Sequence, residues 1–537
     1  MTRKLTQGVV TAPQPEAVEA GALALKRGGN AVDAAIATAL VQTAVDPQMC
    51  GIAGMGSMQV YMPAKSVHEF IDFHARCPAA VRPDMWASLM EGETRDGFGF
   101  ILKGRVNDVG YGSIAVPGSY KAYHEALTRF GTLSWGDVVE PAIRYARDGV
   151  RIRPHMHYYW SLAADLGRVD NPDRMKFTPS GRRIYCDADG NLLKPGKTLK
   201  NPDMARALER LARHGPAAFY EGEMADAIEA DMKAHGGLIT KADMRDYRTR
   251  NLKPIWGTYR GHKVSTGQPP GGGVMLIQML NILENFDLKA LGHNTPEYIR
   301  VVAEAMKRST IDKDAHVGDP EFVQVPVDRL TDKAYARQMA DAIKRGEQAH
   351  VVRVQQEAAD TTQVSVVDRD GNAVTMTHTL GAPSGVISDG LGFMWNGCMG
   401  VFDPRPGRAG SLAPGKSRFS SMSPTIVFKG DDPHIVIGAP GGTNIVMGVL
   451  QAIINVVDHG MTMLEAIAAP RFSATSDTID VVNRIPNFVC AELEAMGYPI
   501  AKSYLSYNFA GVHGIRIVDG VPDGAADPGR DGMALAV

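Results

Sequence analysis

The chain has 537 residues, with 57 lysines and arginines against 59 aspartates and glutamates, and five cysteines. The nearly balanced charge gives no electrostatic footprint for nucleic acid or for an anionic membrane, so a small-molecule substrate is favoured. The cysteines are odd in number and show no paired spacing, which argues against a disulfide framework and against a zinc site.

The first residues do not show the pattern of an exported protein. Their positive charge is not followed by an apolar core of signal-peptide length. No run approaches the roughly 18 apolar residues that a membrane span needs. We therefore expect a cytoplasmic protein without a membrane partner.

Two helices and a strand open the predicted fold. Residues 14–28 have alanines and leucines at helical spacing, and Asn30 caps the helix that follows. A strand within residues 70–78 then runs into a proline-limited loop that carries His74 and Arg76. These elements are typical of a scaffold and by themselves indicate no chemistry.

Residues 360–380 carry the most specific pattern. Two β-branched runs flank Asp370-Gly371, a dipeptide that accepts the positive φ of a tight turn, which predicts an antiparallel hairpin. Thr361 opens the first strand, as a β-favouring residue often does. A cut before Thr361 would give this threonine an α-amine, which titrates near pH 8 and is able to accept the proton of its own hydroxyl.

The second half contains three further motifs: one that matches a phosphate-binding loop and two that are candidates for substrate contacts. Gly410–Ser417 fits the P-loop pattern in full, but a phosphate loop needs a strand before it and a helix after it, and the sequence predicts neither. Ser420 and Ser421 form a serine pair ahead of a strand. Gly441 and Gly442 form a turn at a helix start, where unpaired N–H groups suit an anion.

The run from Thr361 to Leu380 and the sequence Ser-Ser-Met-Ser-Pro-Thr-Ile from Ser420 resemble the γ-glutamyltranspeptidase family of N-terminal nucleophile hydrolases. The resemblance implies an α+β fold, a four-layer αββα sandwich with two mixed sheets. It also implies a precursor that cuts itself into a large subunit, 1–360, and a small subunit, 361–537. Residues 343–360 would be a polar, flexible approach to the cut.

The same resemblance assigns roles in amide acyl transfer. Six residues take them: Thr361 as nucleophile, Thr379 as its hydrogen-bond partner, Gly441 and Gly442 at the oxyanion, and Ser420 and Ser421 at the substrate carboxylate. A small amide would give its acyl group to water or to an amine, with no metal or organic cofactor. The two subunits are each other's expected partners, and a dimer of such pairs is left open.

Several residues depart from the family pattern. His74 stands where the family has an arginine for the substrate carboxylate, and Arg76, on the same face of an extended segment, is a replacement or simply a solvated side chain. Gln363 replaces a histidine. Gly381 replaces an asparagine at the substrate's amino end, and residues 396–402 lack the expected aspartate.

These departures leave the acyl donor open. A γ-glutamyl compound such as glutathione is one possibility. The other is a small acid amide without the α-amine, as in the oxamate amidohydrolase and cephalosporin acylase branches. A nucleotide-binding protein and an uncut, non-catalytic relative remain as alternatives of other classes.

Overall fold

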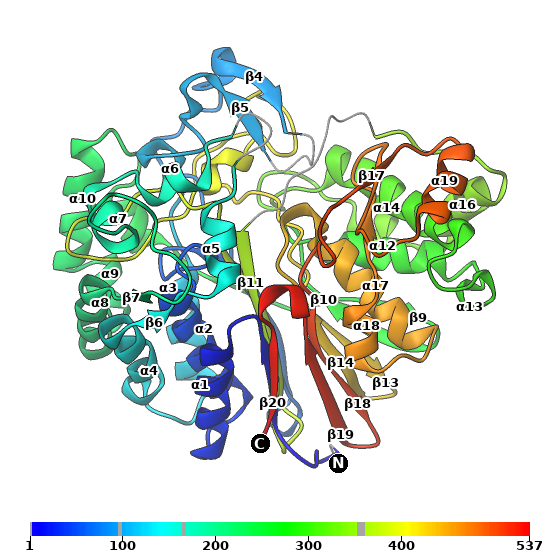
Figure 1. The fold of residues 1–537 in the computed structure, drawn as a ribbon, viewed down its shortest axis with the longest axis horizontal. Coiled ribbons are helices and arrows are strands. Elements are labelled where there is room, and N and C mark those ends of the chain that lie inside the picture. Colours follow the sequence, from blue (N-terminus) through cyan, green and yellow to red (C-terminus); the bar gives the residue numbers. More distant parts are fainter. Residues whose placement is uncertain (1–2, 95–98, 164–167, 352–359) are drawn as a thin grey trace.

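The computed structural model describes residues 3–94, 99–163, 168–351 and 360–537 (Figure 1). Two β-sheets lie face to face in the centre, and helices cover the outer face of each. This arrangement confirms the expected four-layer αββα sandwich. Part of the expected approach to the cut, residues 352–359, lies outside the described residues.

The first sheet contains the predicted hairpin at its centre. Its seven strands, in spatial order, are β20 (Met533–Ala536), β1 (Val9–Ala12), β11 (Asp360–Val367), β12 (Ala373–Gly381), β2 (Met55–Met62), β3 (Val67–Phe73) and β8 (Arg250–Leu252). The chain's first and last strands are thus neighbours, with Val9 opposite Ala536.

The second sheet faces β11 and β12 through strands β14 and β18. Its six strands, in spatial order, are β19 (Val521–Ala526), β18 (His513–Val518), β14 (Asp432–Gly438), β13 (Thr425–Lys429), β10 (His262–Thr266) and β9 (Ile255–Tyr259). The two sheets are also joined by polar contacts, since the Thr375 hydroxyl donates to the Ile437 carbonyl at 3.1 Å.

Both large sheets are antiparallel throughout their described strands, so the expectation of mixed sheets is wrong. The cause is local. Strands that follow each other closely, such as β2 and β3 or β13 and β14, are joined by short turns, and a short turn can only return the chain antiparallel. The hairpin of β11 and β12 is of this kind, and its turn residue Gly371 has the predicted positive φ of 80°.

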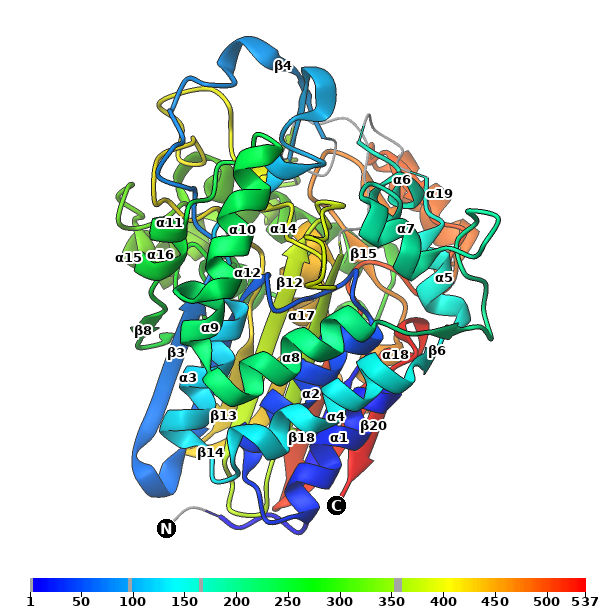
Figure 2. The same cartoon turned by 90° about the vertical axis from the view of Figure 1, so that its left-hand side faces the viewer.

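The helices that cover the first sheet are visible from the side in Figure 2. They include α1 (Pro15–Lys26), α2 (Ala31–Val45), α3 (Ser119–Phe130), α4 (Trp135–Asp148) and α8 (Pro202–His214). Every residue of α2 is buried, because its many alanines let α1, α4 and the sheet approach it closely. Asn30 caps its start, as the sequence predicted, and also forms a capping box with Asp33.

Another group of helices lies behind the second sheet. They include α12 (Gly273–Leu283), α14 (Pro296–His316), α16 (Lys333–Lys344), α17 (Ile445–Val457) and α18 (Met463–Ala468). Within the described ranges, no helix is long and apolar enough to cross a membrane.

Candidate active site

The hairpin brings two threonine hydroxyls together at one end of the first sheet. Thr361 Oγ1 donates to Thr379 Oγ1 at 3.1 Å, and Thr379 Oγ1 also accepts the backbone N–H of Gly381 at 2.8 Å. Thr361 is 4% exposed and Thr379 is 2% exposed. The two strands therefore fix the direction of the Thr361 hydroxyl before any substrate binds.

A glycine turn lies beyond the end of β14. Gly441 has a φ of 136° and Gly442 a φ of 56°, and a Cβ added to Gly441 would lie 2.6 Å from the Ala510 Cα. Glycine is needed here for both conformation and space. Among the described residues, neither glycine N–H is bonded to a backbone or side-chain acceptor, so both remain available to a developing oxyanion.

The threonines and the glycine turn belong to the same end of the sandwich. Gln363, on the same strand face as Thr361, lies with its amide 2.5 Å from the position of a Cβ on Gly438, the last residue of β14. Thr361 precedes Gln363 by two residues, and Gly441 follows Gly438 by three. Sheet packing thus places Thr361 and the glycine turn on one side of this contact.

The serine pair reaches the glycine turn directly. Ser421 Oγ donates to the Gly442 carbonyl, and the Ser420 N–H donates to the Pro270 carbonyl at 2.9 Å. Both serines are nearly buried. Ser421 and Thr443 border a small cavity that shares Lys313 and Phe419 with an open hollow of about 500 Å³. The hollow and the small cavity therefore adjoin each other at these two residues.

His74 and Arg76 have partners of their own. His74 Nδ1 lies 2.5 Å from Asp72 Oδ1 in a buried pair, and β3, which precedes it, is two strands away from β12. The Arg76 guanidinium donates to the Arg248 carbonyl at 2.9 Å and lies over the Tyr247 ring. The backbone of Arg76 forms a bridge to Ser417, three residues before Ser420.

Gln363, which stands at the family's histidine position, is fully buried between the sheets. Its amide nitrogen donates to Thr375 Oγ1 at 2.9 Å, and its amide oxygen accepts from Thr377 Oγ1 at 2.6 Å. These contacts join the two hairpin strands on the face that carries Thr361. Gln363 therefore stabilises the pairing of β11 and β12 next to Thr361 and Thr379.

Sequence reasoning missed a buried cation beside Gly381. Arg418 is 3% exposed, and one of its guanidinium nitrogens lies 3.1 Å from the position of a Cβ on Gly381. It donates to the thiol of Cys398 and to the Phe419 carbonyl. Burial lowers the pKa of Arg418. An arginine two residues before the serine pair was the available sequence signal.

The P-loop lookalike has neither of the elements that a phosphate loop requires. Residues 410–417 form turns, and the next regular element is strand β13. The Lys416 ammonium lies over the Phe322 ring, and the Ser417 N–H donates to Asp319 at 2.8 Å. The predicted lack of a phosphate-binding context is confirmed.

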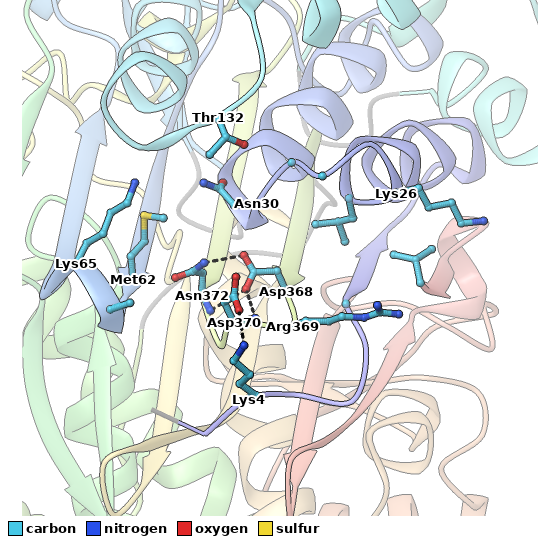
Figure 3. A pocket seen from close by; sticks show the side chains of 16 residues that line it. Lys4, Lys26, Asn30, Met62, Lys65, Thr132, Asp368, Arg369, Asp370 and Asn372 are labelled. Atoms are coloured by element: carbon cyan, nitrogen blue, oxygen red, sulfur yellow. Dashed lines mark hydrogen bonds and ion pairs between the residues drawn. The ribbon is translucent and has the colours of Figure 1, made fainter. Parts of the chain in front are cut away.

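A larger hollow, of about 930 Å³, lies at the turn end of the hairpin (Figure 3). Its labelled lysines are spread around the rim, while Asp368 points to Asn372 and Lys4 to Asp370. Asp368 also accepts the N–H of Ala31 at the start of α2, at 2.9 Å. Asp368 thus attaches the hairpin turn to helix α2. The residues that line the hollow include neither Thr361 nor Thr379.

Two sheets between helical layers, with a threonine hydroxyl held at the start of a central strand beside a glycine turn, define the class of N-terminal nucleophile hydrolases. Among solved structures, cephalosporin acylase from Bacillus halodurans superposes with a TM-score of 0.88 at 28% identity, covering 100% of this chain and 96% of that one. The chain belongs to the gamma-glutamyltranspeptidase family, whose match spans residues 17–537.

Relatives with two kinds of name cover almost the whole chain. The acylase ACY 1 proenzyme of Pseudomonas sp. (strain V22) is 37% identical over 99% of this chain and 94% of its own length. The glutathione hydrolase proenzyme of Escherichia coli (strain K12) is 34% identical over 97% and 90%. The gamma-glutamyltranspeptidase of Helicobacter pylori matches with a TM-score of 0.55 at 32% identity, covering 62% of this chain and 90% of that one.

Proposed function

We propose that the chain cuts itself between Asp360 and Thr361 and that Thr361 then transfers the acyl group of a small, carboxylate-bearing amide to water or to an amine. The large subunit would be residues 1–360 and the small subunit residues 361–537. The observation that carries the proposal is the hydrogen-bonded pair Thr361 and Thr379, held rigidly by the N–H of Gly381.

In the proposed reaction, the Thr361 oxygen attacks the amide carbon and forms an ester as the C–N bond breaks. The new α-amine of Thr361 takes the hydroxyl proton and passes it to the leaving amine. Water then attacks the ester carbon, which releases the acid and restores the threonine. The N–H groups of Gly441 and Gly442 stabilise the oxyanion in both steps.

The donor has two candidates. The family and the glutathione hydrolase relatives support a γ-glutamyl amide. The acylase relatives, together with Gly381 and the run 396–402 without an acid, favour an amide whose acid lacks the α-amine. Ser420 and Ser421 would hold a carboxylate in either case.

The test compares wild type with Thr361→Ala and Thr361→Ser. Wild type and Thr361→Ser should resolve on a denaturing gel into fragments of about two-thirds and one-third of the chain, the smaller beginning Thr-Thr-Gln-Val in wild type, whereas Thr361→Ala should remain whole and inactive. The processed protein is then screened with γ-glutamyl and glutaryl anilides and with oxamate. An active full-length chain, or a processed chain that hydrolyses no amide, would contradict the proposal.

A further inference from the structure

The loop before strand β18 contains a strained, buried pair of residues. Phe509 and Ala510 have φ values of 61° and 69°, and in the described part of the chain they are the only neighbouring non-glycine residues with positive φ. Both are 5% exposed, so the strain does not belong to a loose surface turn. Such residues persist only where the surrounding structure requires them. Glycine would adopt the same conformation freely, so the methyl group of Ala510 indicates a contact that compensates for the strain.

The Ala510 methyl group lies between two glycines. A Cβ added to Gly441 would lie 2.6 Å from the Ala510 Cα and 3.0 Å from its Cβ. A Cβ added to Gly448, the fourth residue of helix α17, would lie 2.8 Å from the same methyl group. Carbon atoms in contact prefer separations of about 3.5–4.0 Å, so both positions need glycine for this packing. Ala510 therefore packs against the glycine turn and the start of α17 at once.

A backbone hydrogen bond joins the same two segments. The N–H of Gly511 donates to the Pro440 carbonyl at 3.0 Å, directly before Gly441. Gly441 and Ala510 also border a cavity of only about 20 Å³, which has room for about one water molecule. The strained segment is thus fastened to the glycine turn, and the turn has little space in which to shift.

The orientation of the glycine turn decides where its N–H groups point. A donor stabilises an oxyanion only if it is already aimed at the oxygen, and a displacement of about 1 Å can cost about 100-fold in rate. Gly441 and Gly442 have no side chains with which to hold the turn, so neighbouring residues must do so. The Ser421 hydroxyl holds the Gly442 carbonyl, whereas Gly441 is contacted by Ala510.

We propose that Ala510 is a positioning residue of the reaction, whose methyl group fixes the orientation of the Gly441 N–H toward the oxyanion. This inference rests on the proposed function, because it takes Thr361 as the nucleophile and the glycine turn as the oxyanion site. Ala510 acts only through Gly441 and touches no substrate. Since the oxyanion exists only while the amide reacts, loss of the methyl group should lower kcat and leave ground-state binding unchanged.

The experiment compares processed wild type with processed Ala510→Gly. The substrate is whichever of the γ-glutamyl and glutaryl anilides wild type hydrolyses faster, and the matching acid, glutamate or glutarate, is the inhibitor. Ala510→Gly should lower kcat by about 10- to 100-fold, while inhibition by the acid stays within about threefold. Its Tm should stay within about 2 °C of wild type, because relief of the strain offsets the lost methyl contacts.

The matched control is Ser66→Gly, which relieves a φ of 54° at an exposed position between β2 and β3 and should leave kcat unchanged. A wild-type kcat in Ala510→Gly would overturn the proposal. An equal loss of kcat in Ser66→Gly would do the same, and so would an Ala510→Gly variant whose affinity for the acid falls as much as its kcat.

A second substitution tests the contact itself. Gly448→Ala adds a methyl group against Ala510 from the helix and should lower kcat about 10-fold. When both substitutions are combined, one methyl group again fills the space, so the double variant should be more active than either single variant. Losses that simply multiply would overturn the proposal.

If Ala510→Gly gives no processed protein, self-cleavage becomes the readout. Cleavage should then return in the double variant, and a double variant that stays uncut would overturn the proposal. Failure of the proposed function looks different, because wild type itself would then remain uncut or, once processed, would hydrolyse neither anilide.

Discussion

The hairpin of β11 and β12 has a turn end, around Gly371, and a threonine end, at Thr361 and Thr379. The two ends differ in how their hydrogen-bonding groups are used. At the turn end, Asp368 accepts hydrogen bonds from the N–H groups of Ala31, Asp370 and Asn372, and from the Asn372 side chain. At the threonine end, the Thr379 hydroxyl accepts from the Thr361 hydroxyl and the Gly381 N–H. In the turn after β14, the N–H groups of Gly441 and Gly442 have no acceptor among the described residues. The larger hollow lies at the turn end, yet the groups that we propose to react lie at the other end. Unused hydrogen-bonding capacity therefore locates this site better than volume does.

The largest effect on catalysis is expected from a change at the threonine end, Thr379→Val, which removes the hydroxyl that accepts from Thr361. We expect kcat to fall by about 10²- to 10³-fold and self-cleavage to slow, because the nucleophile loses its fixed orientation. Thr379→Ser keeps the hydroxyl and should stay within about 10-fold. Rates of processing and of anilide hydrolysis measure both variants. A valine variant as active as the serine variant would show that the hydroxyl pair has no catalytic role.

Two glycine substitutions, one in the turn after β14 and one in the hairpin turn, separate effects on catalysis from effects on stability. Gly441→Ala should lower kcat about 100-fold, because the new Cβ meets Ala510 and displaces an oxyanion donor. Gly371→Ala also forces a side chain into positive φ, but at the turn, where it should cost about 1–2 kcal/mol of unfolding free energy and leave kcat unchanged. Comparable losses of kcat in both variants would mean that the two ends are not independent.

At the turn end, Asp368→Ala should act on stability alone. It leaves several buried N–H groups without an acceptor and detaches the hairpin turn from α2, which we expect to cost about 2–4 kcal/mol. Urea unfolding measures this loss, and kcat of the folded, processed fraction should remain that of wild type. Asp370→Ala, at a more exposed position of the same turn, is the matched control and should change stability by less than about 1 kcal/mol.

The smallest effect concerns His378, which lies between the two ends on the helix-facing side. It is fully buried, bonded to Tyr123 and Gln42, and burial lowers its pKa to about 3. Because the unfolded chain binds a proton near pH 6.5 and the folded chain does not, stability is present above pH 6.5 and is lost as the pH falls toward 3.

Replacing His378 with glutamine removes this titration. Between pH 6.5 and 5, the unfolding free energy of wild type should fall by about 1 kcal/mol per pH unit more steeply than that of His378→Gln. Chemical unfolding at several pH values measures the two slopes. Parallel slopes would show that His378 is protonated in the folded protein.

Neighbouring residues in the sequence were sufficient to predict individual helices and strands, but not which side chains meet in the folded protein. Asp370-Gly371 predicted the hairpin, and Asn30 predicted the start of α2, because turns and caps depend on residues next to each other. The four layers came from the family resemblance. The contact of Arg76 with the Arg248 carbonyl, and the burial of Arg418 against Gly381 and Cys398, depend on which loops meet in space. No periodicity or spacing within one segment carries that information.

The order of strands in the first sheet has a mechanical consequence. A cut before Thr361 would assign β1 to the large fragment, while its two neighbours, β20 and β11, would belong to the small one. β2 of the large fragment would in turn pair with β12 of the small fragment. Pulling the fragments apart would break three strand interfaces in this sheet and another between β10 and β13. Exchange of fragments between molecules would then be as slow as global unfolding. Each large fragment would therefore stay paired with the small fragment from its own precursor chain.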